Sequence, residues 1–490
     1  MTLSAEKTSI RKAAPEPEPS EALYEARKPI YPQSVSGRFR TLKWGLLVGG
    51  LLLYYLLPFL RWDRGPDQPG QAVLIDLGNG RFYCFGVEIW PQEVYYITGL
   101  LILAAFTLFL TNALAGRVWC GYLCPQTVWT DLYLLIERWT QGERRERMRA
   151  AGQPWTRRTL GEALLKHALW LLVALLTGGA LALYFADAPT LVKQLATFQA
   201  PMQAYLWIGI FTFTTYALAG FAREQVCLYM CPWPRIQAAL TDEWALNVTY
   251  RVDRGEPRGS LKKARALREA GQPAGDCVDC DQCVVVCPTG VDIRGGINMG
   301  CIQCGLCIDA CDAVMSKVGR PTGLIGYDTD NNVERRAQGL PALKPKIFRA
   351  RTIVYMALIG VVAAAMGFSL ATRHTLGVDV MHDRNPIYVA LSDGSLRNGY
   401  TVRVLNKLGS ARAFALSLDG LPQGRLEVLG RKSDGGVLDV QVEADQTLEL
   451  RVMVTTPPSA ALPQSTPIRM VLTDARTGEQ AARADFFKGP

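Results

Sequence analysis

Long uncharged runs alternate with charged segments along the first three quarters of the chain. Five runs are long enough to cross about 30 Å of hydrocarbon as helices, which takes roughly 17–25 residues. One such run alone could also be a buried helix of a soluble protein, but five together predict an α-helical membrane protein. The expected spans are Trp44–Leu60, Val94–Gly116, His167–Ala186, Tyr205–Ala222 and Thr352–Thr372.

Lys and Arg residues are distributed unequally between the connecting segments. Eight precede the first span and nine lie between spans two and three, but the segment between spans one and two carries three and the next outer one only Lys193. Basic loops face the cytoplasm. With five spans, we therefore expect a multi-pass membrane protein whose N-terminus is cytoplasmic and whose C-terminal part lies on the outer side. The net charge of +9 then follows from topology, and no nucleic-acid partner is expected.

Alternating apolar and polar residues follow the last span, in short runs separated by turn residues. This pattern favours an all-β immunoglobulin-like sandwich, with a barrel as the alternative. The expected strands are Ile387–Leu391, Tyr400–Leu405, Ala413–Leu418, Arg425–Leu429, Val437–Val442, Thr447–Val454 and Ile468–Leu472. An Asn79-Gly80 turn between spans one and two also predicts a β-hairpin.

Eight cysteines between spans four and five form two runs with the spacing C-x2-C-x2-C-x3-C. In two-cluster bacterial ferredoxins the fourth cysteine of each run binds the cluster of the other run. Zinc sites, which usually pair two ligands before a long gap, fit this spacing less well. We expect two [4Fe–4S] clusters in a ferredoxin-like α+β insert. The expected ligands are Cys277, Cys280, Cys283 and Cys311 for the first cluster, and Cys301, Cys304, Cys307 and Cys287 for the second.

A second cysteine motif is repeated after spans two and four. Each span ends in Ala-Leu-Ala-Gly and is followed by Cys-x3-Cys-Pro, which supplies Cys120 and Cys124 in one copy and Cys227 and Cys231 in the other. If helical, each pair shares one face, and the proline ends or kinks that helix. Such thiols suit Cu(I), zinc or an iron–sulfur cluster, or redox chemistry as a disulfide. Buried structural cysteines are the simpler alternative.

These patterns divide the chain into five parts. They are a disordered cytoplasmic arm (1–43), spans one to four with the repeated motif (44–256), the ferredoxin-like domain (257–350), span five (351–373) and the periplasmic domain (374–490). Cys84, His374 and His382 lie on the outer side by this topology, and the two histidines are weaker candidates for a metal site.

The order of these features resembles the CcoG family of cytochrome c oxidase accessory proteins, also called FixG or RdxA. The resemblance rests on residues 30–40, 120–126, 383–386 and 396–400 together with the double cluster motif. It implies a membrane-bound polyferredoxin of the bacterial inner membrane whose immunoglobulin-like C-terminal domain is periplasmic. The implied reaction is the reduction of Cu(II) to Cu(I) while the cbb-type oxidase matures, with oxidase assembly factors or a copper transporter or chaperone as partners.

We expect an oxidoreductase, a cupric reductase, with copper bound at Cys120, Cys124, Cys227 and Cys231. An unidentified cytoplasmic electron donor would reduce the clusters. The sequence leaves open whether the protein forms a homodimer. One alternative is a quinol- or flavin-linked electron-transfer subunit without a metal substrate. Another is an assembly scaffold with structural clusters.

Overall fold

The computed structural model describes residues 29–490 apart from 66–67, 297, 409, 429–436, 445 and 459–462. The first 28 residues of the expected arm lie outside the described residues. The expectation that disorder reaches residue 43 is wrong, because helix α1 begins at Arg38. Residues 29–36 are extended and attach to the cluster-bearing part of the chain, where the Gln33 amide donates to the Val285 carbonyl at 3.0 Å.

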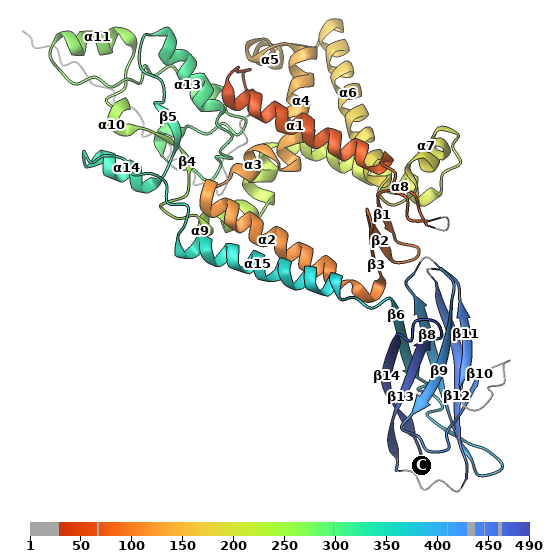
Figure 1. The fold of residues 1–490 in the computed structure, drawn as a ribbon. Helices are drawn as coiled ribbons and strands as arrows, with labels where there is room; N and C mark the ends of the chain where they lie inside the picture. The colour runs from red at the N-terminus through yellow and green to blue at the C-terminus, as the bar shows by residue number, and fades with distance from the viewer. Residues whose placement is uncertain are drawn as a thin grey trace, which may run out of the picture.

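Five helices long and apolar enough to span a membrane confirm the transmembrane prediction. They run between a cysteine-rich domain at one end and a β-domain at the other (Figure 1). The third helix begins ten residues earlier than expected, so His167 lies inside it and not at its start. The helices are α1 (Arg38–Leu56) with the 3-10 turn η1 (Leu57–Phe59), α2 (Tyr95–Ala115), α6 (Arg157–Ala182), α8 (Met202–Thr215) continued by the π-helix η3 (Tyr216–Ala222), and α15 (Ala350–Ala371).

Small residues bring the membrane helices together. A Cβ atom on Gly178 of α6 would lie 2.8 Å from the Ile208 carbonyl oxygen of α8, and one on Gly99 of α2 would overlap the Met366 side chain of α15. Lipid is as apolar as the helices, so such close backbone approach, and not hydrophobic burial, drives their association.

The cluster domain, residues 247–337, is built on a two-stranded sheet of β4 (Asn247–Tyr250) and β5 (Ile325–Asp328). It therefore begins before residue 257, where the sequence placed its start. Strand β4 is only four residues long and its partner follows about 75 residues later, so no local pattern marks it. The helices of this domain are α10 (Val252–Gly255), α11 (Leu261–Glu269), α12 (Gln282–Val285), α13 (Leu306–Lys317) and α14 (Asp330–Ala337), with the 3-10 turn η5 (Ile293–Gly295).

The C-terminal domain is a sandwich of two antiparallel sheets, which confirms the immunoglobulin-like prediction over the barrel. One sheet has the order β10-β12-β8-β6 with β7 beside β8, and the other has the order β11-β9-β13-β14. Alternate residues such as Val402, Val404, Phe414 and Leu416 are fully buried between them. The strands are β6 (Leu376–His382), β7 (Val389–Ala390), β8 (Leu396–Asn406), β9 (Arg412–Asp419), β10 (Arg425–Val428), β11 (Leu438–Val442), β12 (Thr447–Thr456), β13 (Ser465–Asp474) and β14 (Gln480–Lys488).

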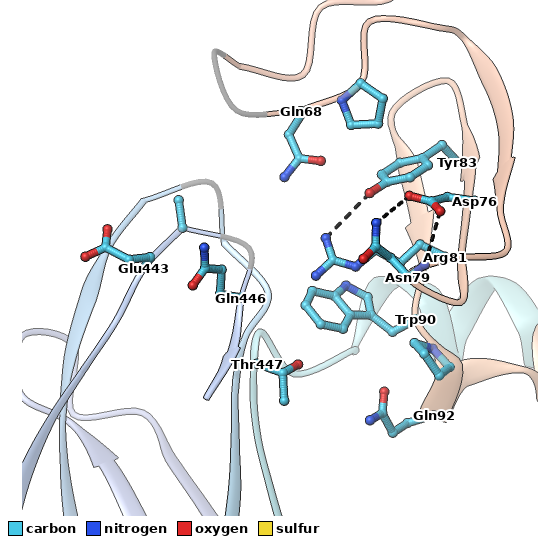
Figure 2. A pocket seen from close by; sticks show the side chains of 13 residues that line it. Gln68, Asp76, Asn79, Arg81, Tyr83, Trp90, Gln92, Glu443, Gln446 and Thr447 are labelled. Carbon is cyan, nitrogen blue, oxygen red and sulfur yellow. Dashed lines mark hydrogen bonds between the residues drawn. The ribbon is translucent and has the colours of Figure 1, made fainter. Parts of the chain in front are cut away.

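A small sheet on the sandwich side of the membrane confirms the predicted hairpin. It consists of β1 (Val73–Asp76), β2 (Arg81–Cys84) and β3 (Val87–Ile89). The sheet and the β11–β12 turn face each other across a polar cavity of about 740 Å³, where Arg81 lies over the Trp90 ring (Figure 2). Lys407 of the sandwich also forms a 2.6 Å ion pair with Glu93, which precedes α2.

Asp309 of α13 attaches the first membrane helix to the cluster domain. Helix α1 has no side-chain cap of its own, and the Asp309 carboxylate accepts hydrogen bonds from the Phe39 amide at 3.2 Å and the Arg40 amide at 2.8 Å. It therefore acts as an N-terminal cap supplied by another element.

We expect Asp309→Ala to destabilise the protein by about 1–2 kcal/mol, since one buried and one partly buried amide lose their acceptor. Asp309→Asn keeps one acceptor oxygen and should lose less. Thermal unfolding of the cluster-loaded protein, followed through cluster absorbance, checks this order. Equal midpoints for the two variants would contradict the capping role.

Candidate metal centres

Four thiols from both cysteine runs line a cavity in the cluster domain. They are Cys277, Cys280, Cys283 and Cys311, and apolar side chains including Met315, Leu324 and Ile325 complete the wall. The fourth member arrives because α13 carries Cys311 one turn beyond Cys307, toward the opposite run. These are the four residues expected to hold the first cluster.

A second cavity lies beside the first and is lined by Cys287, Cys301, Cys304 and Cys307, with Cys283 between the two. Among the described residues, no three His, Cys, Asp or Glu side chains converge on one point to hold a single metal ion. Thiols that surround a space instead of a point suit a multi-iron cluster. The two cavities would therefore hold the [4Fe–4S] clusters with the exchanged fourth ligands that the spacing predicts.

The two cluster loops share an unusual backbone conformation. Two and four residues after the first cysteine of each run, φ is positive, at Asp279 and Asp281 in one loop and at Gln303 and Gly305 in the other. Positive φ is uncommon outside glycine and concentrates at functional sites. In the first loop Arg294 stabilises this turn, with ion pairs of 2.7 Å to Asp279 and 2.6 Å to Asp281.

Burial favours the protonated form of three of the cluster thiols when no metal is bound, because it raises the pKa of each. It raises the pKa of Cys283 to about 11 and those of Cys301 and Cys311 to about 12. Cluster ligands are thiolates, so loading the cavities must release protons.

The repeated Cys-x3-Cys-Pro motif does not form a continuous helix, so the expected i, i+4 face is wrong. The short helix α3 (Val118–Tyr122) carries Cys120, and Cys124 caps the next helix, α4 (Pro125–Gln141). Proline thus begins a helix here, where its missing N–H costs nothing. In the second copy Cys227 lies in the π-helix η4 (Val226–Met230), and α9 (Trp233–Leu240) follows Pro232.

The four motif thiols lie close enough for their charges to interact. Burial raises the pKa of Cys120 to about 11, with contributions from Cys124 and Cys231 that Arg117 opposes. Burial also raises the pKa of Cys227 to about 12, and the other three thiols add to this shift. We call these four residues the thiol quartet.

Both copies of the motif contact the loop of the second cluster. A Cβ atom on Gly121 would lie 2.7 Å from the Ile302 carbonyl oxygen and 3.0 Å from the Cys304 Cα atom. From the second copy, the Leu228 side chain reaches Gly300, where an added Cβ would lie 3.1 Å away. Cys120 and Cys304 also share one buried apolar cluster. Only glycine at position 121 allows the quartet to lie this close to the cluster loop.

Two polar residues that lie beside the quartet, Gln237 and Arg117, were not predicted from the sequence. The Gln237 side-chain oxygen accepts the Cys120 S–H at 3.3 Å and the Arg117 Nε–H at 3.3 Å. The Arg117 amide donates to the Gln303 side chain of the cluster loop at 2.6 Å. In the sequence, Arg117 is marked only by its position directly after the Ala-Leu-Ala-Gly end of span two.

The weaker sequence candidates lie away from this site. Both ring nitrogens of His382 are engaged within the sandwich, by the Asp383 carbonyl at 2.6 Å and the Asn398 side chain at 2.7 Å. His374 is exposed just after α15, and Cys84 ends β2 in the small sheet. The structure does not bring these three residues to the thiol quartet.

Comparison with protein families agrees with this architecture. Residues 222–330 match the description "4Fe-4S dicluster domain", residues 97–141 match "4Fe-4S binding domain", and residues 366–490 match "IG-like fold at C-terminal of FixG". The chain is therefore an iron–sulfur electron-transfer protein of a membrane, with an immunoglobulin-like C-terminal domain.

Curated relatives cover nearly the whole chain. Protein RdxA of Cereibacter sphaeroides is 48% identical over 473 residues, covering 96% of each chain. Protein RdxB of the same organism is 47% identical over 474 residues, covering 96% of this chain and 98% of the relative. Nitrogen fixation protein FixG of Rhizobium meliloti is 46% identical over 461 residues, covering 89% of this chain and 88% of the relative. The chain belongs to the FixG/RdxA/RdxB family.

Exchange of the fourth ligand predicts which cysteine variants behave alike. Cys311→Ser should alter the same cluster as Cys277→Ser, although the two residues belong to different runs, and Cys287→Ser should resemble Cys307→Ser. EPR spectra of the four variants, reduced without oxygen, check the pairing. Cys84→Ser is the control and should keep both signals. If Cys311→Ser resembled Cys307→Ser instead, each run would hold its own cluster.

Proposed function

We propose that this protein passes electrons from its clusters to the thiol quartet, where Cu(II) is reduced to Cu(I). Each copper ion takes one electron from one reduced cluster. The observation that carries this proposal is the contact of both thiol motifs with the loop of the second cluster, through Gly121 and Leu228. Thiolates prefer Cu(I), so the quartet would favour the product.

The neighbouring residues would control the thiols and the cluster loop together. Gln237 orients the Cys120 S–H, and Arg117 bonds both to Gln237 and to Gln303 of the loop. Arg117 also opposes the shift that burial causes in the pKa of Cys120 and Cys227, which favours the thiolates that a copper ion needs.

The basic segments support an orientation with the clusters in the cytoplasm. Helix α5 (Arg144–Ala151), with its four arginines, and the start of α6 extend from the cluster side of the membrane helices (Figure 1). By the positive-inside rule this side is cytoplasmic and the sandwich is periplasmic, in the inner membrane. The family resemblance then favours a role in maturing a cbb-type oxidase, with copper delivered by a transporter or chaperone.

A double variant, Cys120→Ser with Cys124→Ser, should abolish copper reduction by the reduced clusters and keep both clusters. The assay uses dithionite-reduced, desalted protein with excess Cu(II) and a Cu(I)-specific chelator under anaerobic conditions. Free thiols also reduce copper stoichiometrically, so the electrons that reach copper must be counted against the absorbance that the clusters regain as they are oxidised. The Cys84→Ser control should match the wild type. Unchanged cluster reoxidation by Cu(II) in the double variant would remove these thiols from the site.

Gly121→Val should separate the quartet from the cluster loop without removing a thiol. We expect the rate of cluster reoxidation by Cu(II) to fall about 10- to 100-fold, since small displacements cost this much in catalysis. Gly179→Val is the matched control, because a Cβ there meets nothing within 4 Å. A wild-type rate in Gly121→Val, with stable clusters, would argue against transfer through this contact.

A second candidate for the quartet is a third iron–sulfur cluster. The match of residues 97–141 to a "4Fe-4S binding domain" favours it, because that segment contains Cys120 and Cys124. Iron counting on anaerobically purified protein distinguishes a copper site from a third cluster at the quartet. About eight irons per chain fits two clusters and a quartet available to copper, and about twelve fits three clusters.

A further inference from the structure

A large cavity lies where the membrane helix α6 and the end of η3 meet α4 and α5, and the proposed function does not use it. It measures about 500 Å³, which is within the usual range for small-molecule sites. Its walls come from α4, α5, α6 and the end of η3, with residues 29–31 at one edge. One helical face of α6 contributes Thr159, Glu162, Lys166, His167 and Trp170.

His167 lines this cavity from inside a membrane helix, among aromatic rings. The Tyr216 hydroxyl bonds its Nδ1 at 3.0 Å, Trp170 meets its ring edge to face at 5.2 Å, and Phe221 stacks on it at 5.9 Å between centroids. An ionisable residue within a membrane span is costly and usually functional. The aromatic walls suit a planar ring, and the imidazole offers one polar partner to it.

Charges around the cavity are balanced. Glu137 pairs with Arg147 at 2.7 Å and with Arg223, and Lys166 lies 4.8 Å from the centroid of the Trp170 ring. Together with Glu162 and Glu224, three carboxylates face three cations. Balanced charge does not favour a nucleotide or an anionic phospholipid. It suits a neutral ring whose polar ends need hydrogen-bond partners.

The cavity is joined to both thiol motifs. Gln126, two residues after Cys124, donates from its side chain to the Leu218 carbonyl at 2.9 Å and the Arg223 carbonyl at 3.1 Å. After η3 ends at Ala222, a short break at residues 223–225 leads into the second π-helix η4, which carries Cys227 of the second motif. An added Cβ on Gly220 of η3 would lie 3.1 Å from the Trp170 ring. The segment from η3 to η4 therefore has the cavity at one end and the quartet at the other.

We propose that this cavity binds a membrane quinol and oxidises it, which supplies the electrons for the proposed function. A quinol has a planar neutral ring with two hydroxyls and dissolves in the lipid of the membrane. On oxidation it loses two electrons and two protons and becomes the quinone. Each electron reduces one [4Fe–4S]²⁺ cluster to [4Fe–4S]⁺. His167 accepts one proton, and a cavity carboxylate accepts the other.

The test uses cluster-loaded protein in detergent without oxygen, with decylubiquinol and menadiol as electron donors. Loss of cluster absorbance should follow either quinol in the wild type. His167→Phe keeps a ring between Trp170 and Phe221 but removes the proton acceptor, so the rate should fall about 100-fold. His374→Phe, on the sandwich side, is the matched control and should keep the wild-type rate. Dithionite should reduce both variants fully, which verifies their clusters.

Failure of either quinol to reduce wild-type clusters, or a wild-type rate in His167→Phe, would overturn the proposal. Reduction by NADH or reduced flavin but by neither quinol would overturn it as well. Copper reduction is measured separately, on dithionite-reduced protein without quinol. There, His167→Phe should reduce Cu(II) at the wild-type rate. The quinol site and the copper site can therefore fail independently.

Discussion

The close contact between the second cluster loop and the membrane-edge segments is the constraint on which the rest of the structure depends. Three close contacts join this loop and the helix that follows it to α1 and α3. Gly121 lies against Cys304, the Phe39 ring lies 2.8 Å from where a Cβ on Gly305 would be, and Asp309 binds the start of α1. The cluster domain is thus part of one body with the cluster-side ends of the membrane helices. This contact allows thiols on membrane segments to lie beside a cluster in a separate domain.

Buried charge stabilises the same interface. Lys43 of α1 is 2% exposed and its ammonium lies 2.9 Å from the Asp131 carboxylate of α4, which Arg40 also approaches at 3.2 Å. Buried pairs return little net stability, but removal of one partner leaves an uncompensated charge. The pairing therefore fixes the angle at which α1 meets α4 more than it adds to the free energy of unfolding.

The membrane explains why the cysteine-bearing and irregular segments lie at one end of the helix bundle. Lipid-facing helices need no polar partners, and α15 has no buried residue in its most apolar window. Irregular backbone is tolerated only where protein covers it. Both π-helical segments and both thiol motifs accordingly lie where the cluster domain and α4 cover the ends of the spans.

The sequence by itself determined the elements that depend on local or strictly spaced residues. Runs without charge gave the five spans, period-two alternation gave most sandwich strands, and the spacing of eight cysteines predicted which thiols would line each cavity. It missed β4, whose partner is distant, and β6, which follows the last span almost directly. It also missed β14, whose Gln480-Ala-Ala-Arg-Ala-Asp stretch is too polar to resemble a strand. Tertiary structure alone decided that Gly121 touches the cluster loop and that His167 faces a cavity. Each of these depends on packing between segments about 50 to 180 residues apart in the sequence. No local sequence pattern indicates which segments so far apart will make contact.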